Sequence, residues 1–226
     1  NKLADFVKPG ISTLEIDQFG EKAIRDLGCV PNFLNYNGYP ASICVSVNDE
    51  VVHGIPSKDR ILQDGDIVSL DAGLIHEGYH SDAARTHAVG NISEEAKRLI
   101  EVTKQSFFEG IKLAVPGNHL FDISEAIQKY VESNGYSVVR DLVGHGIGTH
   151  LHEDPQIPNF KQRRKGMKLR PGMTLAIEPM VNEGSYDVVW LDDDWTVVTE
   201  DGSLAAHYEN TIVITEDGCE ILTLSE

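Results

Sequence analysis

The sequence contains 226 residues, of which 41% are hydrophobic and 24% charged, as in an ordinary soluble globular protein. Its formal net charge of −17 disfavours non-specific binding to nucleic acid, and no apolar run approaches the roughly 20 residues that a membrane helix needs. The three cysteines are widely spaced and form no CxxC motif, which is typical of a reducing compartment and argues against a zinc finger. We therefore expect a cytoplasmic protein with no DNA or membrane partner, and we also expect a monomer.

The first 40 residues predict helices followed by an ordered loop. Apolar residues with helical spacing over 3–7 indicate that the sequence begins inside a truncated first helix. Ser12 and Glu15 are spaced as in a capping box, and the apolar positions that follow predict an amphipathic helix ending at Gly28. Residues 29–40 are rich in Asn, Pro, Gly and Tyr, so they predict a loop.

A hairpin is predicted over residues 67–87. The apolar run 67–70 has the pattern of a strand and ends at Asp71, and Asp82 follows eleven residues later, after a connection that contains Gly78. Hairpin partners lie side by side, so the two carboxylates are expected to be close. Each Asp by itself is also a common turn cap, but two adjacent carboxylates need a shared proton or a cation.

The second half predicts two further helices, over 93–113 and 123–131, followed by a region rich in strands. A strand is expected from Val138 towards the glycine-rich run 144–148. The apolar runs that predict the remaining strands are 174–177, 196–198, 211–214 and 220–224.

The two halves share a spacing of 107 residues. The pairs are Pro9-Gly10 with Pro116-Gly117, Gly28 with Gly135, and Asp71 with Glu178. We interpret this spacing as an internal duplication of an α/β unit, about 1–90 and 91–226, within one catalytic domain over 1–226. A pseudo-twofold axis would bring the equivalent strand ends together, which predicts a site between the halves.

Five side chains are candidates for a metal centre: Asp71, Asp82, His145, Glu178 and Glu209. Four carboxylates and one imidazole contain too much oxygen for a structural zinc site. They suit two divalent cations such as Mn, Fe(II), Co or Zn, and a metal pair of this kind supports hydrolysis. Each residue by itself has a plainer interpretation, as a turn cap, a loop residue before proline or a hydrogen-bonded core histidine.

Eight motifs cover nearly the whole chain: 45–56, 64–71, 78–82, 144–148, 152–156, 168–173, 177–179 and 209–213. Together they resemble the motifs of type I methionine aminopeptidases. The resemblance implies an α+β pita-bread fold, with two pseudo-symmetric α/β halves around a central antiparallel sheet. It also implies removal of the initiator methionine from nascent proteins when the next residue is small, by attack of a metal-bridging hydroxide on the first peptide bond.

The resemblance also implies roles for individual residues. The five candidates would be the metal ligands, Asp82 and Glu209 would bridge the two ions, and Glu178 would also act as the base. His53 and His152 would lie just outside the metals. One of them would contact the substrate amine or leaving nitrogen, and the other the scissile carbonyl oxygen.

An apolar pocket for the methionine side chain is expected beside the metals. The residues that match family pocket positions are Phe33, Tyr36, Tyr39, Cys44, His53 and Trp195. Leu151 stands where an aromatic residue is frequent in the family, so the sequence does not define the shape of the pocket. An aromatic cluster of this kind is also common as plain packing.

Two alternative functions and one further partner remain open. An Xaa-Pro peptidase of the same fold would use the same ligands with a different pocket, and a non-catalytic binding module would use the scaffold without metal. The basic run 161–170 suggests docking to the ribosome, whereas the run 186–201 is acidic and argues against it.

Overall fold

The computed structural model describes residues 1–224, so the last two residues of the predicted domain lie outside the described part. The helices are α1 (Lys2–Phe6), α2 (Thr13–Asp26), the 3-10 turn η1 (Tyr36–Gly38), α3 (Glu94–Ile111) and α4 (Leu120–Ser133). The strands are β1 (Val30–Pro31), β2 (Cys44–Val47), β3 (Glu50–Val52), β4 (Ile67–His76), β5 (Tyr79–Ala88), β6 (Ser137–Val138), β7 (Gly144–Gly146), β8 (Glu153–Ile157), β9 (Thr174–Ile177), β10 (Met180–Asn182), β11 (Val188–Trp190), β12 (Val197–Thr199), β13 (Ala205–His207), β14 (Asn210–Ile214) and β15 (Cys219–Ile221).

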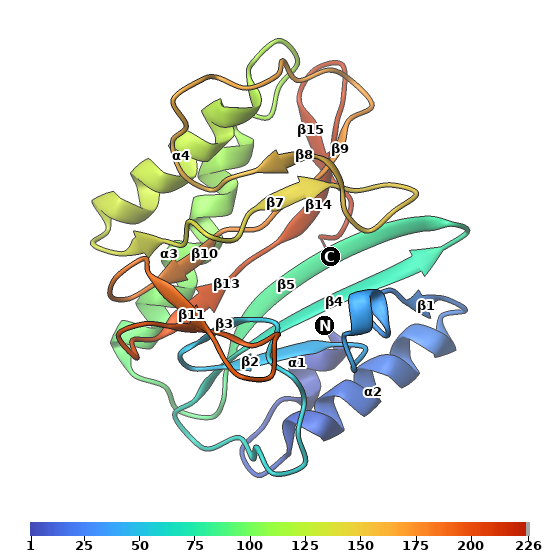
Figure 1. Ribbon diagram of the computed structural model, residues 1–226, viewed down its shortest axis with the longest axis vertical. Coiled ribbons are helices and arrows are strands. Elements are labelled where there is room, and N and C mark those ends of the chain that lie inside the picture. The colour runs from blue at the N-terminus through green and yellow to red at the C-terminus, as the bar shows by residue number, and fades with distance from the viewer. Residues whose placement is uncertain (225–226) are drawn as a thin grey trace.

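The strands form antiparallel sheets between two pairs of helices (Figure 1). Helices α1 and α2 lie beside β1, β2 and β4, whereas α3 and α4 lie beside β6, β8, β10 and β13. The larger sheets have the orders β1-β4-β2, with β5 on β4, and β15-β14-β9-β7-β8. This mixture of helices and antiparallel strands is the α+β class predicted from the sequence. The internal duplication stays a prediction.

Helix α2 begins as its sequence predicts and then anchors a neighbouring strand. Ser12 and Glu15 form the capping box, with the Ser12 side chain accepting from the Glu15 N–H and the Glu15 carboxylate accepting from Ser12. On the buried face of the helix, the Asp17 carboxylate accepts the N–H groups of Ser42 and Ile43 at 2.8 and 2.9 Å. These bonds fix the segment that leads into β2.

The hairpin β4–β5 is longer and tighter than predicted. The strands run to His76 and resume at Tyr79, so the connection is only Glu77 and Gly78, both with positive φ (50° and 85°). Asp71 pairs with Ala84, and Asp82 pairs with Gly73. The two carboxylates are therefore diagonal neighbours on one face of the hairpin rather than direct partners.

Strands β7, β9 and β14, from the second half of the chain, lie opposite the β4–β5 hairpin. β9 pairs with β14 and β7, so that Ile177 lies opposite Asn210 and His145 lies opposite Ala176. Gly144 is required in β7, because a Cβ at this position would lie 2.4 Å from the Ala176 carbonyl oxygen. The three strand ends thus meet beside the β4–β5 hairpin.

The largest core cluster lies under α3 and α4, with the fully buried Phe107 packed against Phe108 and Tyr208. Helix α4 begins three residues earlier than predicted, because the Asp122 carboxylate caps the N–H of His119. A second cluster packs α2 against β2 and β4. Of the helices within residues 1–224, none is long and apolar enough to span a membrane.

The anchoring of β2 by α2 predicts the effect of removing one carboxylate. Asp17→Ala leaves the buried N–H groups of Ser42 and Ile43 without an acceptor, so the free energy of unfolding should fall by about 2 kcal/mol. Urea unfolding measures this change. Asp26→Ala on the same helix removes an exposed carboxylate paired only with Lys22, and it should have almost no effect. An equal loss in the two variants would contradict the anchoring role.

Candidate metal centre

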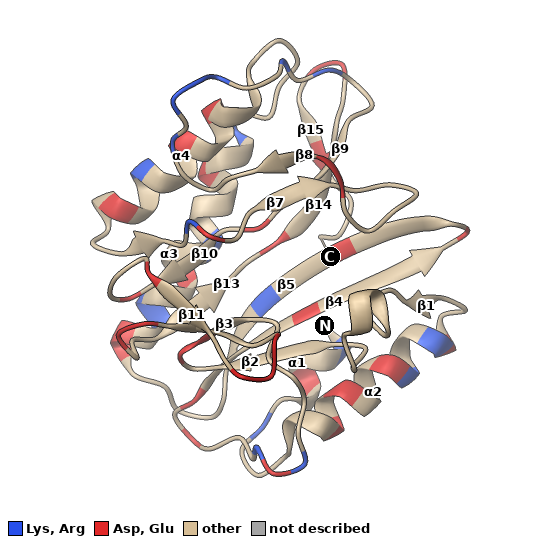
Figure 2. Cartoon of the chain, in the orientation of Figure 1, with Lys and Arg blue, Asp and Glu red and all other residues tan. Residues whose placement is uncertain are grey.

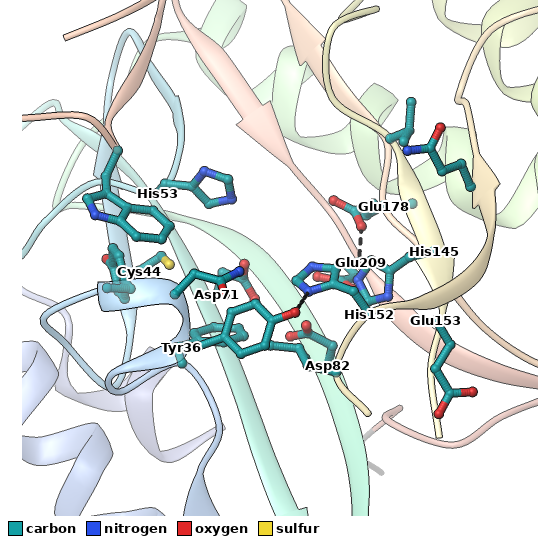
Figure 3. A pocket seen from close by; sticks show the side chains of 18 of the residues that line it. Tyr36, Cys44, His53, Asp71, Asp82, His145, His152, Glu153, Glu178 and Glu209 are labelled. Atoms are coloured by element: carbon teal, nitrogen blue, oxygen red, sulfur yellow. Dashed lines mark hydrogen bonds and ion pairs between the residues drawn. The ribbon is translucent and has the colours of Figure 1, made fainter. Parts of the chain in front are cut away.

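A cavity of about 680 Å³ lies where the two halves meet, and it is lined from both sides (Figure 3). All the site residues expected from the sequence line it: Phe33, Tyr36, Tyr39, Cys44, His53, Asp71, Asp82, His145, His152, Glu178, Trp195 and Glu209. Leu151 lines it as well. The cavity therefore contains both a polar cluster and an apolar region.

The polar cluster is built from strands and strand ends. Asp71 and Asp82 come from the hairpin, His145 lies in β7, Glu178 directly follows β9 and Glu209 directly precedes β14. One ligand atom each of Asp82, His145 and Glu209 can be chosen so that all three lie within 4.8 Å of one another. Nε2 of His145 lies 3.5 Å from Oε1 of Glu178 (Figure 3).

Burial and mutual repulsion disfavour the charged forms of the four carboxyl groups. Burial raises the pKa of Asp71 to about 7. Burial, followed by the charges of Glu209 and Asp71, raises the pKa of Asp82 well above its ordinary value. The pKa values of Glu178 and Glu209 are raised for the same reasons, with burial as the largest cause. Such a cluster is costly unless cations or protons neutralise it.

Buried oxygen atoms without hydrogen-bond partners mark the centre of the cluster. They are Asp71 Oδ1, Asp82 Oδ1 and Glu209 Oε1. Burial lowers the pKa of His145 to about 4, and its Nδ1 lies 2.9 Å from the carbonyl oxygen of Gly146, so the neutral ring turns Nε2 towards the cluster as an acceptor. Unpaired carboxylate oxygens and one imidazole lone pair are the donor set that a divalent cation binds. The residues present therefore fit a metal.

Two further histidines lie next to this cluster. The His152 ring is 4.2 Å from the His145 ring between centroids, and its Nδ1 is 2.8 Å from the Tyr36 hydroxyl. His53 has a left-handed backbone (φ 60°), and its ring is 6.3 Å from that of Trp195. Burial lowers the pKa of His53 to about 4, and partial desolvation lowers that of His152. Both rings are thus neutral near pH 7.

The apolar part of the cavity is a packed cluster of its own. Phe33, Tyr39 and Cys44 are buried and pack with Leu151, while Trp195 is partly buried against them. The Tyr39 ring meets Trp195 edge-on at 5.1 Å, and its hydroxyl donates to the Gly54 carbonyl at 2.9 Å. Burial raises the pKa of the Cys44 thiol well above its ordinary value, so this wall stays uncharged.

Three residues that the sequence did not single out support the cluster. The Thr211 hydroxyl accepts from the N–H of Asp82 and donates to its carbonyl, both at 3.0 Å. The Arg85 guanidinium donates to the carbonyl oxygen of Glu209. His207 Nε2 is buried and lies 4.0 Å from Oε2 of Glu178. The two-residue period of strands could have indicated Thr211 and His207, which flank Glu209 at this spacing.

The raised pKa values predict how stability depends on pH without metal. The pKa of Asp71 is 3.8 in an ordinary, unfolded environment and about 7 in the folded protein. At pH values between the two, Asp71 has lost its proton in the unfolded chain but keeps it in the folded protein. In a chelator the free energy of unfolding should therefore fall as pH rises through this window, and added Mn²⁺ should restore it. Chemical unfolding at several pH values measures both effects.

Two matched variants distinguish the effect of the buried carboxyl cluster from the effect of exposed acidic residues. Asp82→Asn should flatten the pH dependence and weaken the effect of Mn²⁺, because one buried carboxylate is removed. Asp194→Asn makes the same change in an exposed loop and should alter neither. Stability that stays constant over this window in chelator would contradict the electrostatic account.

Comparisons of sequence and of structure with known proteins point to the same family. The sequence model of metallopeptidase family M24 matches residues 1–216. A methionine aminopeptidase of Clostridium acetobutylicum is 58% identical over 226 residues, which are 100% of this chain and 90% of that protein. The crystal structure of a methionine aminopeptidase from Thermotoga maritima superposes with a TM-score of 0.97 at 48% identity, over 99% of this chain and 90% of that one. An Xaa-Pro dipeptidase from Bacillus anthracis gives a TM-score of 0.79 at 25% identity, over 100% of this chain and 56% of that one. The chain therefore belongs to metallopeptidase family M24.

Proposed function

We propose that this protein is a methionine aminopeptidase that removes the N-terminal methionine of newly made proteins when the second residue is small. The observation that carries this proposal is the group of unpartnered buried carboxylate oxygens beside an uncharged apolar wall in one cavity. The relatives named methionine aminopeptidase support the substrate. The cytoplasm is the compartment in which this substrate is made.

The proposed cofactor is a pair of divalent ions, which Asp71, Asp82, His145, Glu178 and Glu209 would hold, and Asp82 and Glu209 would serve both ions. Bound divalent ions lower the pKa of water and polarise a peptide carbonyl group. The donor set, with four carboxylates and one imidazole, suits Mn, Fe(II), Co or Zn. The central positions of Asp82 and Glu209 support the bridging role, because both belong to the compact group with His145.

The protein's own side chains would move the protons. Burial raises the pKa of Glu178, so its carboxyl group can take a proton from water and deliver it to the departing amine. We assign His152 to the scissile carbonyl oxygen, because it lies directly against His145. We assign His53 to the amine side, because it lies towards Trp195 and the apolar wall.

The methionine side chain would occupy the apolar part of the cavity. Phe33, Tyr39, Cys44 and Trp195 form a wall whose polar atoms are few and internally bonded or uncharged. A thioether offers little besides its apolar surface and its polarisable sulfur, so aromatic edges and a neutral thiol suit it. This wall supports methionine over a charged first residue.

The alternatives are less well supported. A proline-specific peptidase would share the ligands, but the Xaa-Pro dipeptidase superposes with a TM-score of 0.79 against 0.97 for the methionine aminopeptidase. A non-catalytic module has no need for four buried carboxylates. Docking to the ribosome rests on Lys and Arg residues along the loop after β8, which runs over α4 (Figure 2), whereas the loop between β11 and β12 is acidic.

Peptide cleavage tests the function directly. The protein should release methionine from Met-Ala-Ser, lose this activity in chelator and regain it when Mn²⁺, Co²⁺, Fe²⁺ or Zn²⁺ is added back. Cleavage of Ala-Pro-Ser should be slower by orders of magnitude under the same conditions. Preferred cleavage of the proline peptide would overturn the assignment, and activity that is indifferent to chelation would overturn the metal dependence.

The proposed role of His152 predicts a loss in the chemical step. His152→Ala removes a donor to the carbonyl oxygen, so kcat on Met-Ala-Ser should fall about 100-fold. The exposed neighbour His150 is the matched control, and His150→Ala should retain the activity of the unaltered protein. Steady-state kinetics measures both variants at saturating metal. Equal kcat for His152→Ala and the unaltered protein would remove His152 from the mechanism.

A further inference from the structure

Tyr36 was expected as a pocket residue, but its hydroxyl is engaged elsewhere. Its oxygen lies 2.8 Å from Nδ1 of His152, the distance of a strong hydrogen bond, and the two rings are 5.2 Å apart between centroids. Figure 3 shows the phenol reaching across the cavity towards the His152 ring. The contact joins residues 116 positions apart in sequence. Tyr36 therefore touches a proposed catalytic group directly.

The backbone around Tyr36 is held in one conformation. The flanking residues Asn35 and Asn37 have left-handed φ values of 64° and 51°, which asparagine tolerates better than most residues. The turn is closed by hydrogen bonds from the Tyr36 N–H to the Phe33 carbonyl and from the Tyr39 N–H to the Tyr36 carbonyl, both 2.9 Å. The phenol is thus presented to His152 from a defined turn.

The direction of this hydrogen bond follows from the donors and acceptors available. A neutral imidazole carries one N–H and one lone pair. If Nδ1 of His152 donated, the Tyr36 hydroxyl hydrogen would need a second acceptor, which solvent would have to supply, because this hydroxyl makes no other hydrogen bond within the described residues. If the hydroxyl donates, one bond satisfies both the hydroxyl hydrogen and the Nδ1 lone pair. A phenol O–H is also the stronger donor, and an imidazole lone pair the stronger acceptor.

The neighbouring His145 shows the opposite arrangement. Its Nδ1 faces the Gly146 carbonyl oxygen, which can only accept, so the proton is on Nδ1 and the lone pair is on Nε2. His152 instead meets a hydroxyl at Nδ1, which can donate and so allows the proton to be on Nε2. Two imidazoles 4.2 Å apart therefore have different partners at Nδ1, an obligate acceptor for His145 and a hydroxyl for His152.

We propose that Tyr36 is a positioning residue whose hydroxyl donates to Nδ1 of His152 and holds that ring in the Nε2–H tautomer. The Nε2–H then serves as the donor to the oxygen of the scissile carbonyl, a use that rests on the function proposed above. Tyr36 contributes to the reaction through His152 and not through contact with the methionine side chain. Removing the hydroxyl should slow the chemical step and leave substrate binding intact.

Nitrogen NMR of the zinc-loaded protein tests the tautomer without reference to activity. In the unaltered protein, Nε2 of His152 should resonate as a protonated nitrogen and Nδ1 as a nitrogen with a free lone pair. Tyr36→Phe keeps the ring and removes only the hydroxyl, so the two signals should move towards each other as both tautomers become populated. Unchanged His152 signals in Tyr36→Phe would overturn the proposal.

Kinetics on Met-Ala-Ser gives a second readout. In Tyr36→Phe, kcat should fall about tenfold while KM stays the same, the loss expected when one ordinary hydrogen bond no longer selects the tautomer. Tyr130→Phe removes a hydroxyl on α4, away from the cavity, and should change neither constant. A rise in KM at constant kcat would instead make Tyr36 a substrate contact and overturn the positioning role.

A double-mutant cycle links the effect to His152. His152→Gln places an amide donor near the position of Nε2 and has no tautomer to select, so adding Tyr36→Phe to it should lower kcat no further. A full tenfold additional loss in the double variant would contradict the proposal. If the unaltered protein released no methionine, the proposed function would fail, while the nitrogen signals would still decide the tautomer.

Discussion

Four buried or largely buried carboxyl groups share one cavity, and their repulsion is the constraint on which the rest of the site depends. Asp71, Asp82, Glu178 and Glu209 come from four separate segments, and burial raises the pKa of each. Chain folding alone does not favour this arrangement, because desolvating several acids in one place is costly. Their proposed role as cation ligands would explain why the fold nevertheless brings them together.

The surrounding structure holds this unfavourable cluster rigidly. The β4–β5 hairpin has an uninterrupted ladder from Ile67 to Ala88, so Asp71 and Asp82 cannot move apart independently. Thr211 connects Asp82 to β14 through two hydrogen bonds, and Arg85 connects β5 to the backbone of Glu209. These contacts cross more than 120 residues of sequence. The geometry of the carboxyl cluster is thus set by strand pairing rather than by flexible loops.

The groups around the carboxyl cluster differ in how their protonation is set. A backbone carbonyl sets the tautomer of His145, and a phenol faces the same atom of His152. The apolar wall beside them contains a buried thiol kept neutral by burial. One cavity therefore contains a cluster of carboxyl groups, neutral imidazoles and an uncharged apolar wall.

The sequence predicted which side chains share a cavity better than how they are arranged. All the expected side chains line one cavity. The five metal-ligand candidates stood out beside strand-like runs in the sequence, whereas the other residues came from the resemblance to type I methionine aminopeptidases. The diagonal placement of Asp71 and Asp82 was not predictable, since it depends on a two-residue turn that the pattern suggested was longer. The role of Asp17 was hidden as well, because no local pattern reveals that a helix carboxylate will cap a strand 25 residues away. The start of α4 was missed because Asp122, rather than Ser or Thr at the N-cap, supplies the side chain that caps it.

Anomalous diffraction from crystals grown with Mn²⁺ would show whether the carboxyl cluster binds a pair of metal ions. We expect two anomalous peaks in the cavity, both within bonding distance of Asp82 and Glu209, with His145 next to one of them. The unpartnered oxygen atoms of Asp71, Asp82 and Glu209 should then all face a metal. A map without peaks there, with the carboxyl groups hydrogen-bonded to one another instead, would contradict the account.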